Sequence, residues 1–244
     1  MNSFPDDSGS AEIFPLEQWP TVRIIHAPPH NVIQSAAFGE AQLRLIREPL
    51  ISFVPKFTKP TVSIGYFQSA SEVPPGTGFV RRLTGGGLVD AENGYSISAM
   101  VPPNHPRFVL SPDELHITFS QAVATALAEV GFPVSLAWDA AAFQPQEGET
   151  FGACFEACFR FDLVRGGRKV AAGSYYRSAT GLMQEMGIHL DQLDATRTGV
   201  ALVRNLTPLY GVAPRESEVT MTERRLAEIL FFERYNTTAW NHAR

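Results

Sequence analysis

The stretch that decides the fold is FDLVRGGRKVAAGSYYR, residues 161–177. Apolar runs stand on both sides of a short polar connection that holds two glycines, Arg165-Gly166-Gly167-Arg168, and this pattern is typical of two antiparallel strands joined by a turn. We therefore predict a hairpin with one strand over 159–164 and the other over 169–177.

Short strands recur on both sides of this hairpin. Apolar and β-branched runs bounded by glycine and proline predict further strands over 21–25, 61–65, 78–82, 95–101 and 180–190. Helical spacing or a capping box predicts helices over 32–47, over 111–131 and from residue 220 onward. Short turns between most strands, with helices interspersed irregularly, favour an α+β fold with a mixed, largely antiparallel sheet and flanking helices over a doubly wound fold.

The composition is that of a globular protein with a sizeable core, because 44% of the 244 residues are apolar. We expect an N-terminal arm over residues 1–20 and a single domain over residues 21–244. Charged residues make up 18% of the chain and the net charge is -5, so the charge balance gives no reason to expect nucleic acid as a partner.

The cysteine content and the N-terminus bear on the compartment. Two cysteines in a chain of this length do not make a disulfide framework, which indicates a reducing environment. The first residues, MNSFPDDSGSAEIF, are acidic and polar where a signal peptide is basic and then apolar, and no run of 18 apolar residues occurs. We expect a cytoplasmic protein without a membrane partner.

A glycine-rich stretch, RRLTGGG over residues 81–87, follows one of the predicted strands. Three successive glycines let the backbone approach a ligand closely and aim its amide groups at an anion or a polarised carbonyl, although a simple glycine-rich turn would look the same. The spacing matches neither a dinucleotide-binding nor a P-loop motif. Arg81 and Arg82 alternate across the strand, so only one of the two is expected to touch a ligand.

Lys169 begins the second strand of the hairpin and is followed by small residues, which leave space above the strand for a ligand. A lone lysine at the end of a hairpin is usually only solvated. The surrounding sequence is nevertheless basic within an acidic protein, which suits an acidic partner or a phosphate-bearing ligand. The basic residues are Arg160, Arg165, Arg168, Lys169 and Arg177.

The two cysteines, Cys154 and Cys158, stand just before this hairpin. A zinc site would need more ligands than His116 and His189 plausibly supply, and a thioredoxin-like redox pair would need C-x-x-C spacing. Buried packing is a strong alternative for either thiol. The remaining possibility is a nucleophile, since a thiolate attacks acyl carbonyls and Lys169 nearby would stabilise both the thiolate and the oxyanion that forms.

Two stretches together resemble a known family. RRLTGGG followed by Tyr95-Ser96, and GRKVAAGS over 167–174, look like the signature stretches of the lipoate-protein ligase A and octanoyltransferase family, within the biotinyl/lipoyl protein ligase superfamily. PTVSIGYFQ over 60–68 is similar to the family segment in which a strand ends in G-x-x-Q, and FGEAQL over 38–43 resembles its early helix loosely. The likeness covers about residues 20–195 and implies that residues 21–244 form one catalytic domain of that fold.

ACFEA, residues 153–157, indicates the branch of the family. It resembles the "ACFDA" segment of the cysteine-dependent octanoyltransferases, whose cysteine becomes acylated, whereas the ATP-dependent ligases tend to carry an arginine-asparagine stretch there. Two departures stand out. The family usually has a histidine shortly after the glycines, where this chain reads LVDAEN over 88–93, and it does not reserve a cysteine at Cys158, which suggests a structural role for that residue.

The resemblance implies an octanoyl/lipoyl transferase in protein lipoylation, with Cys154 and Lys169 as catalytic residues and no metal. The donor would be octanoyl acyl carrier protein or an octanoylated lipoyl-domain protein, and the acceptor the lysine of a lipoyl domain. No cofactor would be required, because the octanoyl or lipoate group is the substrate. The residues expected to bind substrate are Arg81, Arg82, Thr84, Gly85, Gly86, Gly87, Ala171, Ala172, Gly173 and Ser174.

Two other functions fit the same residues. An ATP-dependent lipoate-protein ligase would use Lys169 and the glycines on an acyl-adenylate and would need ATP and Mg²⁺. A non-catalytic binder of lipoyl or acyl-carrier domains stays open because the histidine after the glycines is missing. Formation of an octanoyl adduct without ATP separates the first function from these two.

Overall fold

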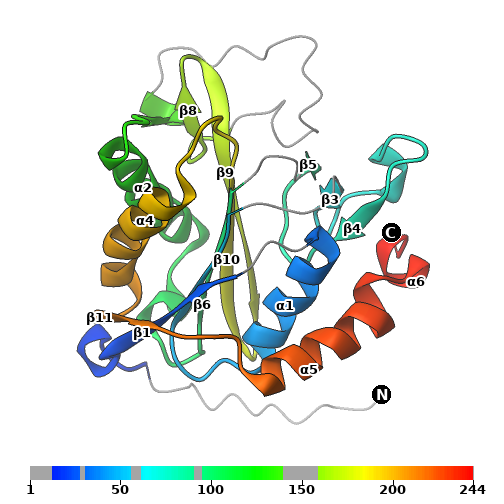
Figure 1. Ribbon diagram of the computed structural model, residues 1–244, viewed down its shortest axis with the longest axis horizontal. Helices are drawn as coiled ribbons and strands as arrows, with labels where there is room; N and C mark the ends of the chain where they lie inside the picture. The colour runs from blue at the N-terminus through cyan, green and yellow to red at the C-terminus, as the bar shows by residue number, and fades with distance from the viewer. Residues whose placement is uncertain (1–12, 28–30, 56–61, 91–94, 140–158, 244) are drawn as a thin grey trace.

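The computed structural model describes residues 13–27, 31–55, 62–90, 95–139 and 159–243 (Figure 1). Two sheets form the centre of the fold. The smaller has three strands in the order β4 (Phe79–Arg81), β3 (Val62–Ile64) and β5 (Val89–Asp90). The larger has eight, in the order β11 (Ala213–Glu216), β1 (Thr21–His26), β2 (Leu50–Val54), β6 (Tyr95–Val101), β10 (Gly181–Ile188), β9 (Arg168–Ser178), β8 (Leu163–Arg165) and β7 (Ser135–Leu136).

The sheets are mixed and mostly antiparallel, as predicted. Strand β1 pairs in parallel with β2 and β11, and β3 pairs in parallel with β4, whereas the other described pairings are antiparallel. The α+β class predicted from the spacing of strands and helices is therefore confirmed.

The hairpin around residues 165–168 is confirmed, but its first strand is shorter than predicted. Gly166 and Gly167 have φ angles of 57° and 78°, which an L side chain rarely adopts, and they turn the chain from β8 into β9. Before β8, the Asp162 amide donates to the Phe159 carbonyl and the Asp162 carboxylate accepts from the Phe159 amide. These two bonds close a turn over 159–162, so the strand begins only at Leu163.

Helices cover both faces of the large sheet (Figure 1). On one face lie α2 (Pro112–Glu129) and α4 (Ala195–Tyr210), which enclose the largest apolar core with β1, β2, β6, β9 and β10. On the other lie α1 (Val32–Arg44) and α5 (Met221–Leu230), which pack against each other. Helix α2 begins at the predicted capping box, in which the side chains of Ser111 and Glu114 each bind the other residue's amide.

Strand β2 (Leu50–Val54) and helix α4 are among the elements that were not predicted. Strand β2, LISFV, is buried at all five positions, so it lacks the alternation that marks a half-buried strand. Helix α4 begins with the poor helix formers Thr196, Thr198 and Gly199 and contains Pro208. It forms because its apolar face packs into the core, where Leu202 and Leu206 are fully buried.

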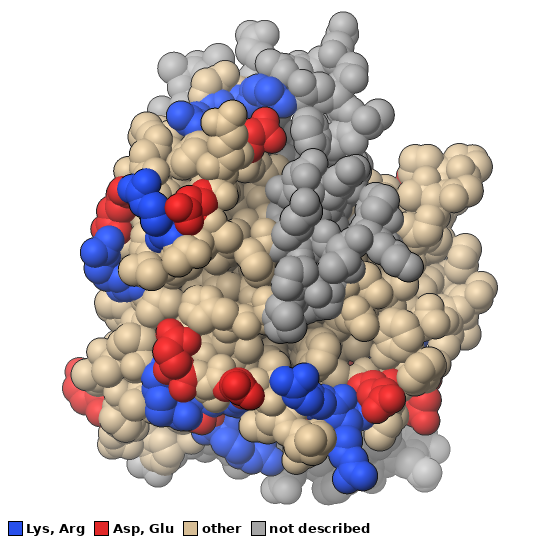
Figure 2. All heavy atoms as spheres, viewed as in Figure 1, with Lys and Arg blue, Asp and Glu red and all other residues tan. Residues whose placement is uncertain are grey.

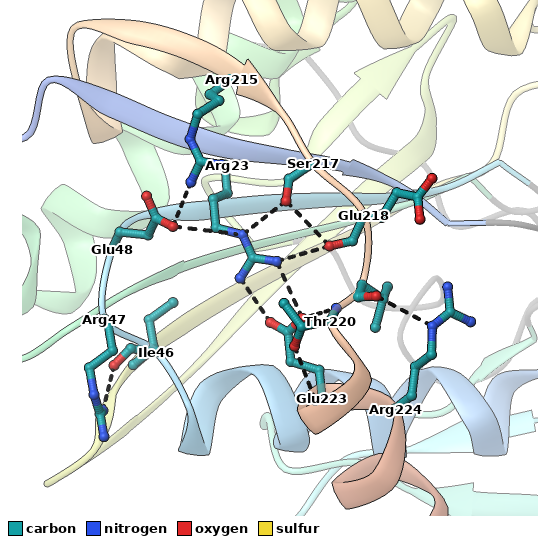
Figure 3. Close-up of polar contacts among 11 residues, drawn as sticks. Arg23, Ile46, Arg47, Glu48, Arg215, Ser217, Glu218, Thr220, Glu223 and Arg224 are labelled. Carbon is teal, nitrogen blue, oxygen red and sulfur yellow. Dashed lines mark hydrogen bonds and ion pairs between the residues drawn. The ribbon is translucent and has the colours of Figure 1, made fainter.

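An ion-pair network joins α5 to β1, the strand next to the edge strand β11 of the large sheet (Figure 3). Arg23 on β1 binds both carboxylate oxygens of Glu223 in the first turn of α5, at 2.9 and 3.2 Å, and donates to Ser217 and to the Glu218 carbonyl. Burial would raise the pKa of Glu223, but the bonds from Arg23 and Thr220 outweigh it and hold the pKa below its ordinary value. The C-terminal helices are thereby attached to the first strand.

The C-terminus also closes onto α1. Glu40 of α1 is almost fully buried and accepts from Arg234 at 2.7 and 2.8 Å, from the Tyr235 hydroxyl at 2.6 Å, and from Arg44. Arg234 and Tyr235 belong to η5 (Phe231–Tyr235), which leads into α6 (Thr238–Asn241). A buried carboxylate with this many charged and polar partners fixes the angle between α1 and the end of the chain.

The end of the predicted N-terminal arm packs against the domain. Leu16–Gln18 form a single 3₁₀ turn, η1, and Trp19 is buried next to His105, with a ring-centroid distance of 5.3 Å. Residues 1–12 lie outside the described residues. In the part of the chain that the structure describes, the helices are too short or too polar to span a bilayer.

Candidate functional site

Two loops follow the paired strands β3 and β4 of the small sheet. Strand β3 ends in the loop over 65–68, which is the G-x-x-Q segment, and β4 ends in the glycine-rich loop over 82–88. The two loops touch through their backbones: a Cβ on Gly65 would lie only 1.9 Å from the carbonyl oxygen of Gly86. Gly86 itself has a φ of 92°. Both glycines are therefore required by the shape of the loops.

Arg82 determines the shape of the glycine-rich loop. Its guanidinium donates to the carbonyl oxygens of Ser63 at 3.1 Å, Gly85 at 2.6 Å and Gly87 at 2.9 Å. These bonds turn the carbonyls of the loop toward the arginine. Arg82 thus joins β3 to the loop, and it also lines the cavity beside it.

Arg81 points to the other side of β4, as the alternation of the pair predicts. It is 1% exposed and donates to the carbonyls of Gly65, Tyr66 and Gln68, which fixes the G-x-x-Q loop. A fourth bond runs to the carbonyl of Asn241 in α6. Arg81 does not line the cavity, and these hydrogen bonds support the G-x-x-Q loop.

A cavity opens where the two signature stretches meet, between α1, the glycine-rich loop and strands β9 and β10. Of the residues predicted to bind substrate, Arg82, Gly86, Ala172, Gly173 and Ser174 line it. Apolar side chains from α1, β5, β6 and β10 form much of the remaining wall. They are Val32, Ala36, Val89, Tyr95 and Met186.

Four other residues predicted to bind substrate do not line this cavity. Thr84 is fully buried with its hydroxyl turned onto Glu185, at 2.7 Å. Gly85 and Gly87 give their carbonyls to Arg82. Ala171 is fully buried in the core on the α2 face of the sheet. These four shape or support the wall of the cavity without lining it.

Glu185 and His189 line the cavity and were not predicted. Glu185 lies opposite Ser174 in the β9–β10 pairing and accepts from Thr84 and, at 3.4 Å, from Ser98. An acidic residue in the middle of the apolar run LMQEMGI was the available signal, because a strand places such a residue in a polar environment or in a site. It was missed because no motif contains it.

Lys169 lies on the cavity-forming strand β9, three residues before Ala172, but does not line the cavity. Its ammonium is 2.7 Å from the Asp162 carboxylate, with side chains only 1% and 7% exposed. The same Asp162 oxygen accepts the Phe159 amide at 2.7 Å. Burial raises the pKa of Asp162, and the Lys169 ammonium opposes this shift.

His116 of α2 adjoins this pair. Its ring stacks on Phe161 and meets Tyr175 edge-on, with centroid distances of 6.1 and 5.5 Å. Burial lowers the pKa of His116, while the carboxylates of Asp162 and Asp113 act in the opposite direction. In the described part of the chain, His, Cys, Asp and Glu side chains form no group of three that would hold a metal ion.

The predicted nucleophile Cys154 and its neighbour Cys158 lie outside the described residues, within 140–158. The basic residues of the hairpin, in contrast, belong to the described part of the chain. Arg160 pairs with Asp113 and Arg165 lies over the Phe132 ring, 5.0 Å from its centroid. Figure 2 shows basic side chains gathered at the end of the molecule where the turn between β8 and β9 lies.

The fold and the two meeting loops define the class of protein. The model of the lipoyl protein ligase A/B catalytic domain matches residues 34–223, and the chain belongs to this family.

Within it, the chain is similar to the octanoyltransferase LipM of Moorella thermoacetica, with 29% identity over 72% of this chain and 66% of the relative. It is also similar to the octanoyltransferase LipM of Brevibacillus brevis, with 30% identity over 72% of this chain and 67% of the relative. The matched region thus spans about two thirds of the length of these relatives.

Solved structures share the fold. Lipoate-protein ligase A bound with ATP superposes with a TM-score of 0.73 at 20% identity, covering 91% of this chain and 98% of the ligase chain. A bi-partite lipoate protein ligase from Thermoplasma acidophilum gives a TM-score of 0.70 at 19% identity, covering 91% and 96%. The expected catalytic-domain fold is therefore confirmed.

Proposed function

We propose that this protein is an octanoyltransferase, which moves an octanoyl group through a thioester on Cys154 to the lysine of a lipoyl domain. The observation that carries the proposal is the cavity at which the two signature stretches meet, with Arg82 and Gly86 on one side and Ala172–Ser174 on the other. The similarity to octanoyltransferases named LipM supports the same reaction.

The cavity suits an acyl chain. Its apolar wall, from Val32 and Ala36 of α1 to Met186 of β10, provides the surface that an eight-carbon chain needs. Cavities of this kind bind through apolar burial, and a few polar groups fix the orientation of the ligand. Arg82 and Ser174 supply such groups at the wall of this cavity.

The reaction has two balanced steps. The Cys154 thiolate attacks the carbonyl carbon of the donor thioester, and the carrier leaves as a thiol after taking up a proton. The amine of the acceptor lysine then attacks the thioester on Cys154, so that an amide forms, the Cys154 thiolate departs and the amine releases a proton. The Lys169 ammonium stabilises the oxyanion that forms in each step.

No nucleotide is needed for this reaction, because a thioester is already activated. The donor is octanoyl acyl carrier protein or an octanoylated lipoyl-domain protein, and the acceptor is a lipoyl domain. A lipoyl domain is the partner named with the T. acidophilum ligase, which shares this fold.

Intact-mass spectrometry tests the proposal. The protein is incubated with octanoyl carrier protein in the absence of ATP, and one octanoyl adduct is expected on the wild type and none on Cys154→Ala. Cys158→Ala is the matched control and keeps the adduct. A wild type that stays unmodified but transfers octanoate once ATP and Mg²⁺ are added is a ligase, and one that transfers under neither condition is a binding protein.

A further inference from the structure

We infer that Asp162 is a positioning residue that orients the Lys169 ammonium for the acyl-transfer reaction. The inference rests on the proposed function and adds a residue that the sequence motifs do not contain. Its basis is the 2.7 Å ion pair between the two side chains, both of which are buried.

The geometry gives Asp162 little freedom. Its carboxylate accepts the Phe159 amide, its own amide donates to the Phe159 carbonyl, and its carbonyl accepts the Ala137 amide. Strand β8 begins at the next residue. A carboxylate held by its own turn and by the sheet provides a fixed anchor for the flexible lysine side chain.

The position of this anchor links two parts of the proposed site. Phe159 comes five residues after Cys154 in the sequence, and its backbone is bound by the same carboxylate oxygen that contacts Lys169. The Lys169 ammonium also lies over the Phe159 ring, 5.8 Å from its centroid. Asp162 therefore fixes where the lysine lies relative to the point at which the segment carrying Cys154 joins the described structure.

The charges around Lys169 define what removing Asp162 would change. Asp162 contacts the ammonium directly, and His116 on α2 interacts with Asp162. Asp113, also on α2, acts on His116 and pairs with Arg160. Replacing Asp162 by asparagine removes the carboxylate that contacts the ammonium, so the ammonium loses the charge that orients it.

The test is the rate of octanoyl-adduct formation, measured over a range of donor concentrations. For Asp162→Asn we expect a rate about tenfold to 100-fold lower at saturating donor with little change in KM, because misplacing a catalytic group affects the chemical step. Asp191→Asn, the same change at an exposed aspartate after β10, keeps the wild-type rate and KM.

A double-mutant cycle separates positioning from a merely structural role. In a Lys169→Met background, Asp162→Asn should cause no further loss of rate, because Asp162 acts through the lysine. The double variant leaves no unpaired buried charge between the two positions, so it keeps the test available if Asp162→Asn alone does not fold. An additional loss in the double variant, or a folded Asp162→Asn with the wild-type rate and KM, overturns the inference.

The proposed function can fail without the inference failing. A wild type without an adduct in the absence of ATP refutes the transferase. The same cycle is then applied to ATP-dependent transfer, in which Lys169 also meets a developing oxyanion, and the same two outcomes decide the role of Asp162. If the wild type transfers under neither condition, Lys169 has no catalytic step to assist and the inference falls with the function.

Discussion

Arg81 and Asn241 are joined by two hydrogen bonds, and Arg81 is the donor in both. The Arg81 amide donates to the Asn241 side-chain oxygen at 2.9 Å, and the Arg81 guanidinium donates to the Asn241 carbonyl at 3.0 Å. The neighbouring Trp240 indole donates to the Arg81 carbonyl at 2.8 Å. Because the same guanidinium binds the loop over 65–68, the C-terminal helix α6 is coupled to a loop at the site.

Replacement of Asn241 by alanine is therefore expected to destabilise the protein. The change leaves the buried Arg81 amide without its acceptor, and an unsatisfied buried donor costs about 1–3 kcal/mol. Urea unfolding measures the loss. Asn236→Ala, an exposed asparagine close by in the chain, is the control and should change the free energy of unfolding by less than about 0.5 kcal/mol. Equal stabilities for the two variants would contradict the role given to Asn241.

Gly65 allows the G-x-x-Q loop and the glycine-rich loop to touch. A Cβ at this position would overlap the Gly86 carbonyl, 1.9 Å away, so Gly65→Ala must displace one of the loops. We expect a loss of about tenfold or more in the rate of octanoyl transfer, since small displacements of a site are costly in rate.

The matched control for Gly65→Ala is Gly78→Ala, at the start of β4. A Cβ there meets no atom within 4 Å, and its φ is not in the left-handed region. This variant should keep the wild-type rate and melting temperature. A Gly65→Ala enzyme with the activity of Gly78→Ala would mean that the contact between the loops does not shape the site.

The parts of the fold that could be predicted are those whose causes are local. The capping box at Ser111 and the glycines of the hairpin turn act within a few residues, and α2 and the β8–β9 turn form where predicted. Helix α4 and strand β2 depend on burial against distant elements. Their sequences lack a local signal, and both were missed.

The same distinction applies to the site. Motifs identified the two loops and strand β9, but not which side chains face the cavity, because that depends on strand register. Glu185 reaches the cavity through its pairing with Ser174, and Arg81 turns away from it toward Asn241, 160 residues later in the chain. Asp162 lies next to Lys169 because a turn precedes β8 where a strand was predicted.

His105 should make the stability of the protein depend on pH. Its ring is fully buried, with Nε2 3.1 Å from the Tyr210 carbonyl and Nδ1 accepting the Arg107 amide. Burial lowers the pKa of His105 to about 4, from 6.5. Between pH 4 and pH 6.5 the His105 ring is protonated in the unfolded chain but not in the folded protein. The contribution of His105 to the free energy of unfolding is therefore complete above pH 6.5 and is lost as the pH falls toward 4.

The expected loss from His105 is on the order of 3 kcal/mol across that range. Urea unfolding at pH 7, 6, 5 and 4 measures it, with His105→Gln as the comparison. The glutamine variant should be less stable at pH 7 but show a shallower decline toward acid, because it has no imidazole to protonate. Parallel declines in the two proteins would show that other groups cause the acid sensitivity.

Glu185 places a carboxylate on the wall of a cavity that is otherwise largely apolar. An acyl chain that reaches this carboxylate must remove water from it, which disfavours longer chains. Glu185→Gln removes the charge and keeps an oxygen that accepts from Thr84. We therefore expect the ratio of the rate with decanoyl donor to the rate with octanoyl donor to rise. A binding free energy for the longer chain that is more favourable by roughly 1 kcal/mol corresponds to a rise of about threefold to tenfold. Adduct formation with each donor, measured by intact mass, gives this ratio. Glu216→Gln, at an exposed position on β11, should leave the ratio unchanged, and an unchanged ratio in Glu185→Gln as well would show that the chain does not reach Glu185.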